Sequence, residues 1–186
     1  MKDRIAKAFI EEIHDKGMKF TMDDLARRLG ISKRTLYEHF SSKVEVLDMI
    51  VDQVSQEADD KTEAIVHNES LTLMEKIKGV MTVLPTHYEL YDLRILDQMK
   101  RYYPEQWAKV NAALVDDWDT LRVLIEEGIR EGIILNKNTA LIMKLIVDAT
   151  NSTLDQRFYM NNNISVSEAL SSIVDVLLYG LVARDS

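Results

Sequence analysis

A group of hydrogen-bonding side chains lies at residues 32–35 of this 186-residue chain. Lys33 and Arg34 can donate to the acceptor atoms of guanine in a DNA major groove, and Thr35 offers both a hydroxyl and a methyl group. A helix that begins after Ser32 would carry all three in its first turn, which is where a recognition helix reads base edges. Their types and spacing therefore indicate contact with double-stranded DNA.

The residues around this group have the spacing of a helix-turn-helix. Two helices that cross closely need a small residue at the crossing, which Ala26 supplies. The turn that follows needs a residue that tolerates positive φ, which Gly30 supplies. Ile31 and Leu36 would then fill the core between the helices. The spacing alone would also suit an ordinary pair of antiparallel helices with a solvated outer face.

Residues 5–48 resemble the DNA-binding domain of the tetracycline-repressor (TetR) family of regulators. The resemblance is carried by Phe20-Thr21, Leu25-Ala26, Gly30-Ile31-Ser32, Thr35-Leu36-Tyr37, His39-Phe40 and Lys43. It implies a homodimeric transcription repressor that binds a pseudo-palindromic operator and is released from it by a small molecule. The implied DNA-binding residues, some on phosphates and some on bases, are Thr21, Ser32, Lys33, Arg34, Thr35, Tyr37, His39 and Lys43.

Some polar side chains of the motif have more than one interpretation. Tyr37 can contact a phosphate, or pack in the core with its hydroxyl at the rim. Glu38 would face phosphates, so it either accepts from a cytosine amino group or points to solvent. Arg27 and Arg28 are expected to form a solvated basic face that steers the DNA.

The charge of the chain is divided unevenly. The net charge of −8 argues by itself against a nucleic-acid partner. Residues 1–46, however, hold ten Lys/Arg and eight Asp/Glu, a net of +2, whereas residues 47–186 hold thirteen and twenty-three, a net of −10. A mildly basic N-terminal segment followed by an acidic remainder is expected if only the N-terminal segment contacts phosphate. We therefore expect a DNA-binding domain over residues 1–46 and a ligand-sensing and dimerisation domain over residues 47–186.

Helical periodicity runs along the chain, and its 6 Gly and 2 Pro are few enough for helices joined by short turns. We expect an all-α fold of about nine helices, with N-caps at Thr21, Ser32, Ser42, Thr72 and Ser165. Residues 59–70 are either the end of a helix or a link. The expected helices cover residues 3–16, 22–29, 33–40, 42 onward, 72 to Pro85, 104–131, 139–160 and 165–183.

The resemblance also implies a ligand cavity between the helices of the larger domain. The side chains available there are mostly apolar or aromatic, which suits an apolar or aromatic effector with one or two polar groups. For any one of them, plain core packing is the alternative. The expected lining residues are Met81, Leu84, His87, Tyr88, Tyr91, Met99, Tyr103, Trp107, Val110, Leu114, Trp118 and Met143.

The last two expected helices carry apolar stripes that are too wide for a single neighbour. Two such helices from each of two subunits would form an intermolecular four-helix bundle, and this predicts a homodimer. Burial against the same chain is the alternative. The expected interface residues are Leu145, Ala149, Val166, Leu170, Ile173, Val174, Leu177 and Leu181.

Other kinds of site have little support in the sequence. The chain has no Cys, and its four His residues are not in the spacing of a zinc protease. We therefore expect no enzyme, no cofactor and no metal. The start of the chain lacks signal-peptide character and no segment suits a membrane span, so a cytoplasmic protein is expected. A different class stays open, namely a helical sensor or protein-binding module whose helix-turn-helix contacts protein.

Overall fold

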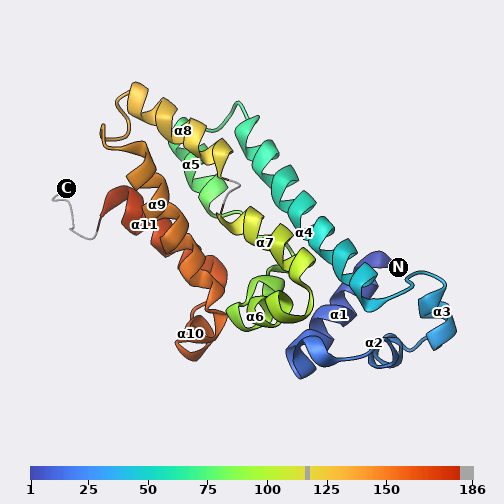
Figure 1. Ribbon diagram of the computed structural model, residues 1–186. Helices are drawn as coiled ribbons and strands as arrows, with labels where there is room; N and C mark the ends of the chain where they lie inside the picture. The colour runs from blue at the N-terminus through green and yellow to red at the C-terminus, as the bar shows by residue number, and fades with distance from the viewer. Residues whose placement is uncertain (116–117, 181–186) are drawn as a thin grey trace. The chain divides into compact units, whose positions relative to one another are not determined.

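The computed structural model describes residues 1–115 and 118–180 (Figure 1). Within these residues the regular structure is helical, with eleven α-helices and no strand, so the expected all-α class is confirmed. The chain divides into two compact units. The first consists of residues 1–57 and 85–112, and the second of residues 58–84 and the described residues from 113 onward.

The first unit carries the helix-turn-helix together with a later segment of the chain. Its core contains the fully buried side chains of Ile5, Phe9, Leu25, Leu36 and Leu47. Its elements are α1 (Lys2–Lys16), the 3-10 turn η1 (Gly17–Lys19), α2 (Met22–Leu29), α3 (Lys33–Tyr37), the first part of α4 (Lys43–Val66), η2 (Tyr88–Tyr91), α6 (Leu93–Tyr102) and most of α7 (Pro104–Val115).

The second unit has its own apolar core, in which Ile77, Leu121, Ile146 and Val174 are buried together. Its helices begin as expected at Thr72 and Ser165, each of which forms a capping box with the Glu three residues later. Its elements are the end of α4, α5 (Leu73–Met81), the end of α7, α8 (Asp119–Arg130), α9 (Thr139–Asn151), η3 (Ser152–Leu154), α10 (Gln156–Asn161) and α11 (Val166–Tyr179).

The single helix expected over residues 104–131 is wrong, because the structure has α7 and α8 in its place. Trp118 lies outside the helical region of φ and ψ, at −115° and 17°. The carbonyl of Leu114, near the end of α7, accepts from Trp118 Nε1 at 3.1 Å and from Asn151 Nδ2 at 2.9 Å. These side-chain donors satisfy a carbonyl that a continuing helix would have bonded internally. Asp116 and Asp117, expected on a solvated face, lie outside the described residues.

The helix expected over residues 139–160 is also interrupted. The α-helix ends at Asn151, where the Ser152 hydroxyl donates to the carbonyl of Ala149 at 2.6 Å. Asp155 then caps a new helix by accepting from the backbone N–H of Phe158 at 3.3 Å. Local hydrogen bonds from short polar side chains therefore stop one helix and start the next.

The sequence left the end of one helix undecided and predicted a later end for another. The polar stretch after residue 59 is largely helical, since α4 continues to Val66, whose carbonyl accepts from Lys76 Nζ at 2.7 Å. At the other end of the chain α11 stops at Tyr179, before the expected residue 183, and the Gly180 N–H donates to Val176 at 2.8 Å.

The described part of the chain shows neither a membrane-spanning helix nor a cluster of metal-ligating side chains. None of its helices combines the length and the apolar character that crossing a membrane would need. Within residues 1–115 and 118–180, no three His, Cys, Asp or Glu side chains gather where they could hold a metal ion.

Candidate nucleic-acid interface

The turn between α2 and α3 has the geometry that the sequence predicts. Gly30 is left-handed, with φ 68° and ψ 29°, and its N–H donates to the carbonyls of Ala26 and Arg27 at the end of α2. The Ile31 N–H also donates to Ala26, at 3.1 Å. Leu36 is fully buried, so α3 is anchored by its inner face and its polar side chains point outward.

The N-terminus of α2 is organised by Thr21. Its hydroxyl accepts from the Asp24 N–H at 3.2 Å and donates to the Asp24 carboxylate at 2.7 Å, while the Thr21 N–H donates to the same carboxylate at 2.8 Å. Lys16 pairs with Asp24 at 2.9 Å, and these contacts hold the pKa of Asp24 well below its usual range. Thr21 itself is exposed beside the positive end of the helix dipole, where a phosphate would be stabilised.

The recognition helix α3 begins at a second cap. Ser32 accepts from the Thr35 N–H at 3.0 Å, and the two hydroxyls lie 2.8 Å apart. Lys33 pairs with Asp23 at 2.7 Å, which raises the pKa of Lys33, and Arg34 donates to Glu38 at 3.2 Å. The Arg34 side chain is 89% exposed, so the helix presents it to solvent. Glu38, for which two roles were open, thus pairs with Arg34.

The α-helix ends at Tyr37 rather than at the expected Phe40. The His39 and Phe40 N–H groups both donate to the carbonyl of Leu36, and this closes the helix into a turn. Phe40 is buried, while Tyr37 and His39 are exposed beside the recognition helix. Tyr37 is therefore a surface residue, which favours the phosphate role over core packing.

Lys43, the first residue of α4, turns inward in this structure. Its ammonium donates to the backbone carbonyls of Met18 at 2.6 Å and Phe20 at 2.7 Å, and lies 3.7 Å from the centroid of the Phe20 ring. Burial lowers the pKa of Lys43 to about 8. Its predicted phosphate contact would require the ammonium to leave, or to share, these carbonyls.

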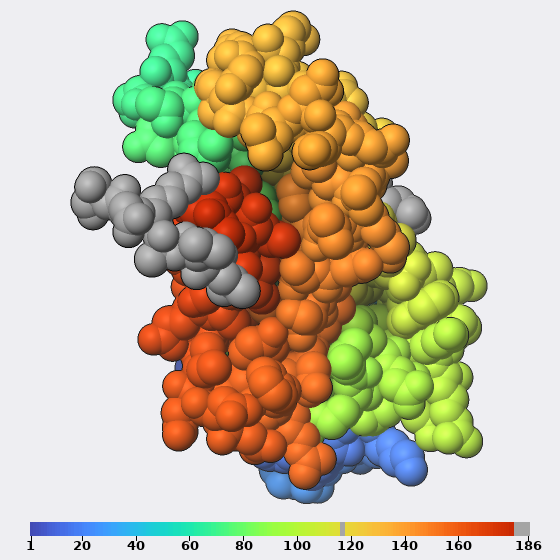
Figure 2. Space-filling view, turned by 90° about the vertical axis from the view of Figure 1, so that its left-hand side faces the viewer, coloured from blue at the N-terminus to red at the C-terminus, as the bar shows by residue number. Residues whose placement is uncertain are grey.

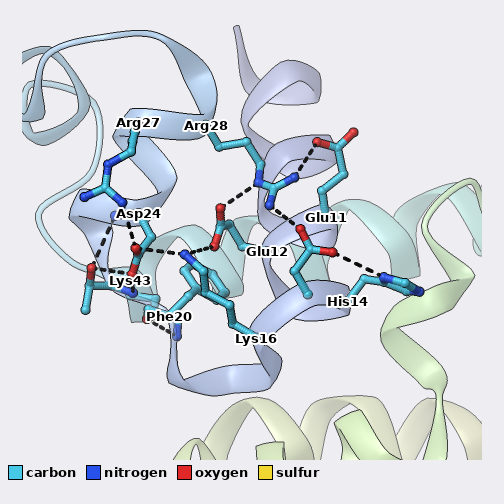
Figure 3. A network of polar contacts seen from close by, with 11 residues as sticks. Glu11, Glu12, His14, Lys16, Phe20, Asp24, Arg27, Arg28 and Lys43 are labelled. Atoms are coloured by element: carbon cyan, nitrogen blue, oxygen red, sulfur yellow. Dashed lines mark hydrogen bonds and ion pairs between the residues drawn. The ribbon is translucent and has the colours of Figure 1, made fainter.

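The two neighbouring arginines of α2 have different environments (Figure 3). Arg28 reaches back to α1, where it donates to Glu12 at 2.6 Å, to Glu11 at 3.4 Å and to Asp15. Its side chain is 27% exposed, compared with 76% for Arg27. The expected solvated basic face therefore consists of Arg27 alone, because Arg28 holds α2 against α1.

The helix-turn-helix thus gathers the eight predicted DNA-binding residues in one part of the first unit. Thr35 and Lys43 are half-buried and the other six are exposed. The sequence did not indicate the roles of Glu12 and Arg28, since the two residues lie on different helices. Gln98 on α6, which contacts η1, was also missed, because eighty positions separate it from its partner Met18.

The predicted ligand-lining residues fall into both units. Within the first unit Met99 and Val110 are buried, and the half-buried residues are His87, Tyr88, Tyr91, Tyr103 and Trp107. Burial raises the pKa values of Tyr88 and Tyr103. Within the second unit Met81 and Met143 belong to the buried core, and the half-buried residues are Leu84, Leu114 and Trp118.

The predicted dimer-interface residues also differ in exposure. Val166, Leu170 and Val174 are buried within the second unit, and Ala149, Ile173 and Leu177 are half-buried. Leu145 is 53% exposed, and Leu181 lies outside the described residues. Other large apolar side chains that point to solvent on α9 and α11 are Leu141, Val176 and Tyr179.

Comparison with known proteins agrees with this geometry. Residues 5–50 match the bacterial regulatory proteins of the tetR family. YvaF, an HTH-type transcriptional regulator from Bacillus subtilis (strain 168), is 34% identical over 185 residues, which cover 100% of this chain and 97% of YvaF.

Solved structures share the fold. PfmR, a TetR-family regulator from Thermus thermophilus, has a TM-score of 0.78 at 24% identity, covering 97% of this chain and 100% of PfmR. FadR from Bacillus subtilis, solved in complex with stearoyl-CoA, has a TM-score of 0.67 at 22% identity, covering 98% of this chain and 100% of FadR.

Proposed function

Because the chain belongs to the TetR family of bacterial regulatory proteins and is a DNA-binding transcriptional regulator, we propose that it is a repressor that binds a pseudo-palindromic operator as a homodimer and leaves it when a small molecule binds. We assign DNA binding to residues 1–46, and ligand sensing and dimerisation to residues 47–186. The proposed site of action is the cytoplasm, where operator DNA lies.

The observation that carries the DNA-binding assignment is the exposed first turn of α3. Lys33 and Arg34 are paired with exposed carboxylates, and exposed ion pairs contribute little, about 0–1 kcal/mol. Base edges or phosphates can therefore replace Asp23 and Glu38 at small cost. Thr21 and Tyr37 would contact phosphates on either side, which fixes the register of the helix in the groove.

Exposed apolar side chains on α9 and α11 support the dimer. The two helices pack side by side in the second unit (Figure 2). Leu141 and Leu145 are one turn apart on α9, and Val176 and Tyr179 lie one turn apart on α11. A second copy packed against α9 and α11 would remove such side chains from water, at about 25 cal/mol for each Å² of apolar surface buried.

The proposed effector is a molecule with a substantial apolar part. Met81 and Met143 in the core of the second unit are side chains that adapt to irregular shapes. FadR from Bacillus subtilis, which shares the fold, is described in complex with stearoyl-CoA. Long-chain acyl-CoA esters are therefore the first compounds to test. An inducer must weaken DNA binding and, by linkage, must itself bind the DNA complex more weakly by the same factor.

A salt titration tests the proposed function. A duplex selected by this protein from a random-sequence pool should lose affinity steeply with salt, with a slope of about −0.9 in log K against log salt for each phosphate contacted. The palindromic symmetry of the selected sequence would report the dimer. An affinity that does not change with salt would contradict DNA binding and favour a helix-turn-helix that contacts protein.

A further inference from the structure

The connection between α1 and α2 adopts a conformation that only glycine takes easily. Gly17 has φ 64° and ψ −162°, a region that is strained for residues with a Cβ atom. A Cβ atom here would lie 2.5 Å from Gln98 Oε1, so the side-chain amide of α6 is packed directly against this backbone. The absence of a side chain at position 17 allows the close approach.

Gln98 also forms a hydrogen bond with this connection. The backbone N–H of Met18 donates to Gln98 Oε1 at 2.8 Å. Met18 is buried, so its N–H would otherwise lack water as a partner. Gln98 is positioned in turn by its helix, where Ile95, Leu96 and Met99 are buried.

The opposite side of the same connection is held by α4. Lys43 donates to the carbonyls of Met18 and Phe20, while Phe20 is buried with its ring edge-on to Phe9 at 4.8 Å between centroids. The connection between α1 and α2 is therefore held by two later helices, by α6 through the Met18 N–H and by α4 through the Met18 and Phe20 carbonyls. Thr21, the cap of α2, follows immediately.

We propose that Gln98 is a positioning residue for DNA binding, which sets the N-terminus of α2 against its phosphate by fixing η1 from α6. The inference rests on the proposed function, since it assumes that Thr21 faces a phosphate. Gln98 does not touch DNA itself. Its contact makes the placement of Thr21 depend on the position of α6, a helix that lies more than seventy residues later in the chain.

A matched pair of substitutions tests this role. Gln98→Met keeps the length of the side chain but removes the acceptor, whereas Gln98→Glu keeps an oxygen acceptor for the Met18 N–H. Asp97→Asn, at an exposed position of the same helix, is the control. The readouts are amide hydrogen exchange at Met18 and the affinity of the active fraction of the protein, both for the duplex selected with the wild-type protein and for random-sequence duplexes.

We expect Gln98→Met to speed exchange at Met18 and to weaken DNA binding by about 2-fold to 10-fold for each subunit, the effect of one lost hydrogen bond. The affinity for random-sequence duplexes should fall by the same factor, because a phosphate contact carries no base information. Gln98→Glu and Asp97→Asn should stay close to the wild-type affinity. Mere loss of stability would lower the active fraction of the protein, which a stoichiometric titration measures, and would leave the affinity of that fraction unchanged.

The two proposals fail in different ways. If the wild-type protein shows no salt-dependent binding, the proposed function is wrong. If the wild-type protein binds DNA with a steeply salt-dependent affinity and the active fraction of Gln98→Met keeps the wild-type affinity, the role of Gln98 is wrong. A loss of affinity in Gln98→Glu equal to that in Gln98→Met would also overturn it, because the acceptor would then be irrelevant.

Discussion

At the scale of single residues, the cations of the helix-turn-helix differ in what they are free to do. Arg28 donates to three carboxylates of α1, and Lys43 donates to two backbone carbonyls. Lys33 and Arg34 have exposed partners that water or DNA can replace. Similar residue types are therefore held within the fold in one case and left accessible to DNA in the other, and sequence alone does not separate Arg27 from Arg28.

Arg34→Ala should relax base preference at one position of each operator half-site. A bidentate contact from arginine to guanine discriminates by about 1–3 kcal/mol, and the loss should be confined to that base pair. Selection of duplexes from a random pool by the variant and the wild-type protein would measure it. A uniform loss for all sequences would instead make Arg34 a phosphate contact.

Arg28→Ala should lower the free energy of unfolding by about 1–3 kcal/mol, because the carboxylate of Glu12 would stay buried with fewer donors. Arg27→Ala is the matched control and should change the free energy of unfolding by less than about 0.5 kcal/mol, since its pair with Asp24 is exposed. Urea denaturation of both variants provides the comparison, and equal losses would mean that Arg28 does not hold α2 to α1.

The DNA affinity of the wild-type protein should fall as the pH rises from about 7 to about 9. Burial lowers the pKa of Lys43 to about 8, so the free protein loses this positive charge in that range, whereas a nearby phosphate favours the protonated form. Binding therefore takes up a proton and weakens above the pKa of the free protein. Lys43→Arg stays charged and should show a flatter pH profile. Identical profiles would exclude Lys43 as the titrating group.

At the scale of elements, local signals predicted where helices begin better than where they end. The capping boxes at Thr21, Thr72 and Ser165 are present as expected, because each depends on two residues three positions apart. The end of α7 was missed, because the donor from Asn151 to its Leu114 carbonyl comes from another helix. The hydrogen bond from the Met18 N–H to Gln98 was missed as well, because its two residues lie on different elements, eighty positions apart in the sequence.

Gly17→Ala should destabilise the protein by more than Gly132→Ala. Both glycines have positive φ, but a Cβ atom at position 132 meets nothing within 4 Å, whereas at position 17 it would meet Gln98. Backbone strain alone costs about 1–3 kcal/mol, and at Gly17 the Gln98 amide must also move away and lose its hydrogen bond with the Met18 N–H. Urea denaturation measures both losses. In a Gln98→Ala background the loss at Gly17 should shrink, and an unchanged loss would contradict the steric contribution.

At the scale of the whole molecule, the proposed regulator needs two helix-turn-helix motifs at a fixed separation, which a dimer provides. The sequence predicts an interface on the last two helices, and this stays a prediction, but it does not indicate which of their apolar residues are exposed. Leu170 and Val174 face the core of their own chain, whereas Leu141 and Leu145 face solvent. Helical periodicity shows that a stripe is apolar, and only the packed structure shows what covers it.

Leu145→Glu should convert the dimer to monomers and weaken operator binding. A carboxylate in an apolar interface would be buried without a partner, which costs several kcal/mol. Leu135→Glu is the control, since Leu135 is 77% exposed between α8 and α9. Sedimentation velocity distinguishes the species. A Leu145→Glu variant that remains dimeric would place the interface on another face.

The pairing of cations with carboxylates in residues 1–46 has a consequence for how the protein finds its target on a chromosome. Five of the ten Lys/Arg in this segment, Lys16, Arg27, Arg28, Lys33 and Arg34, are paired with Asp or Glu. Attraction to random sequence depends on cations that displace condensed counterions, and each carboxylate beside a cation opposes it. We therefore expect short residence on random sequence and a search made of brief hops rather than long slides.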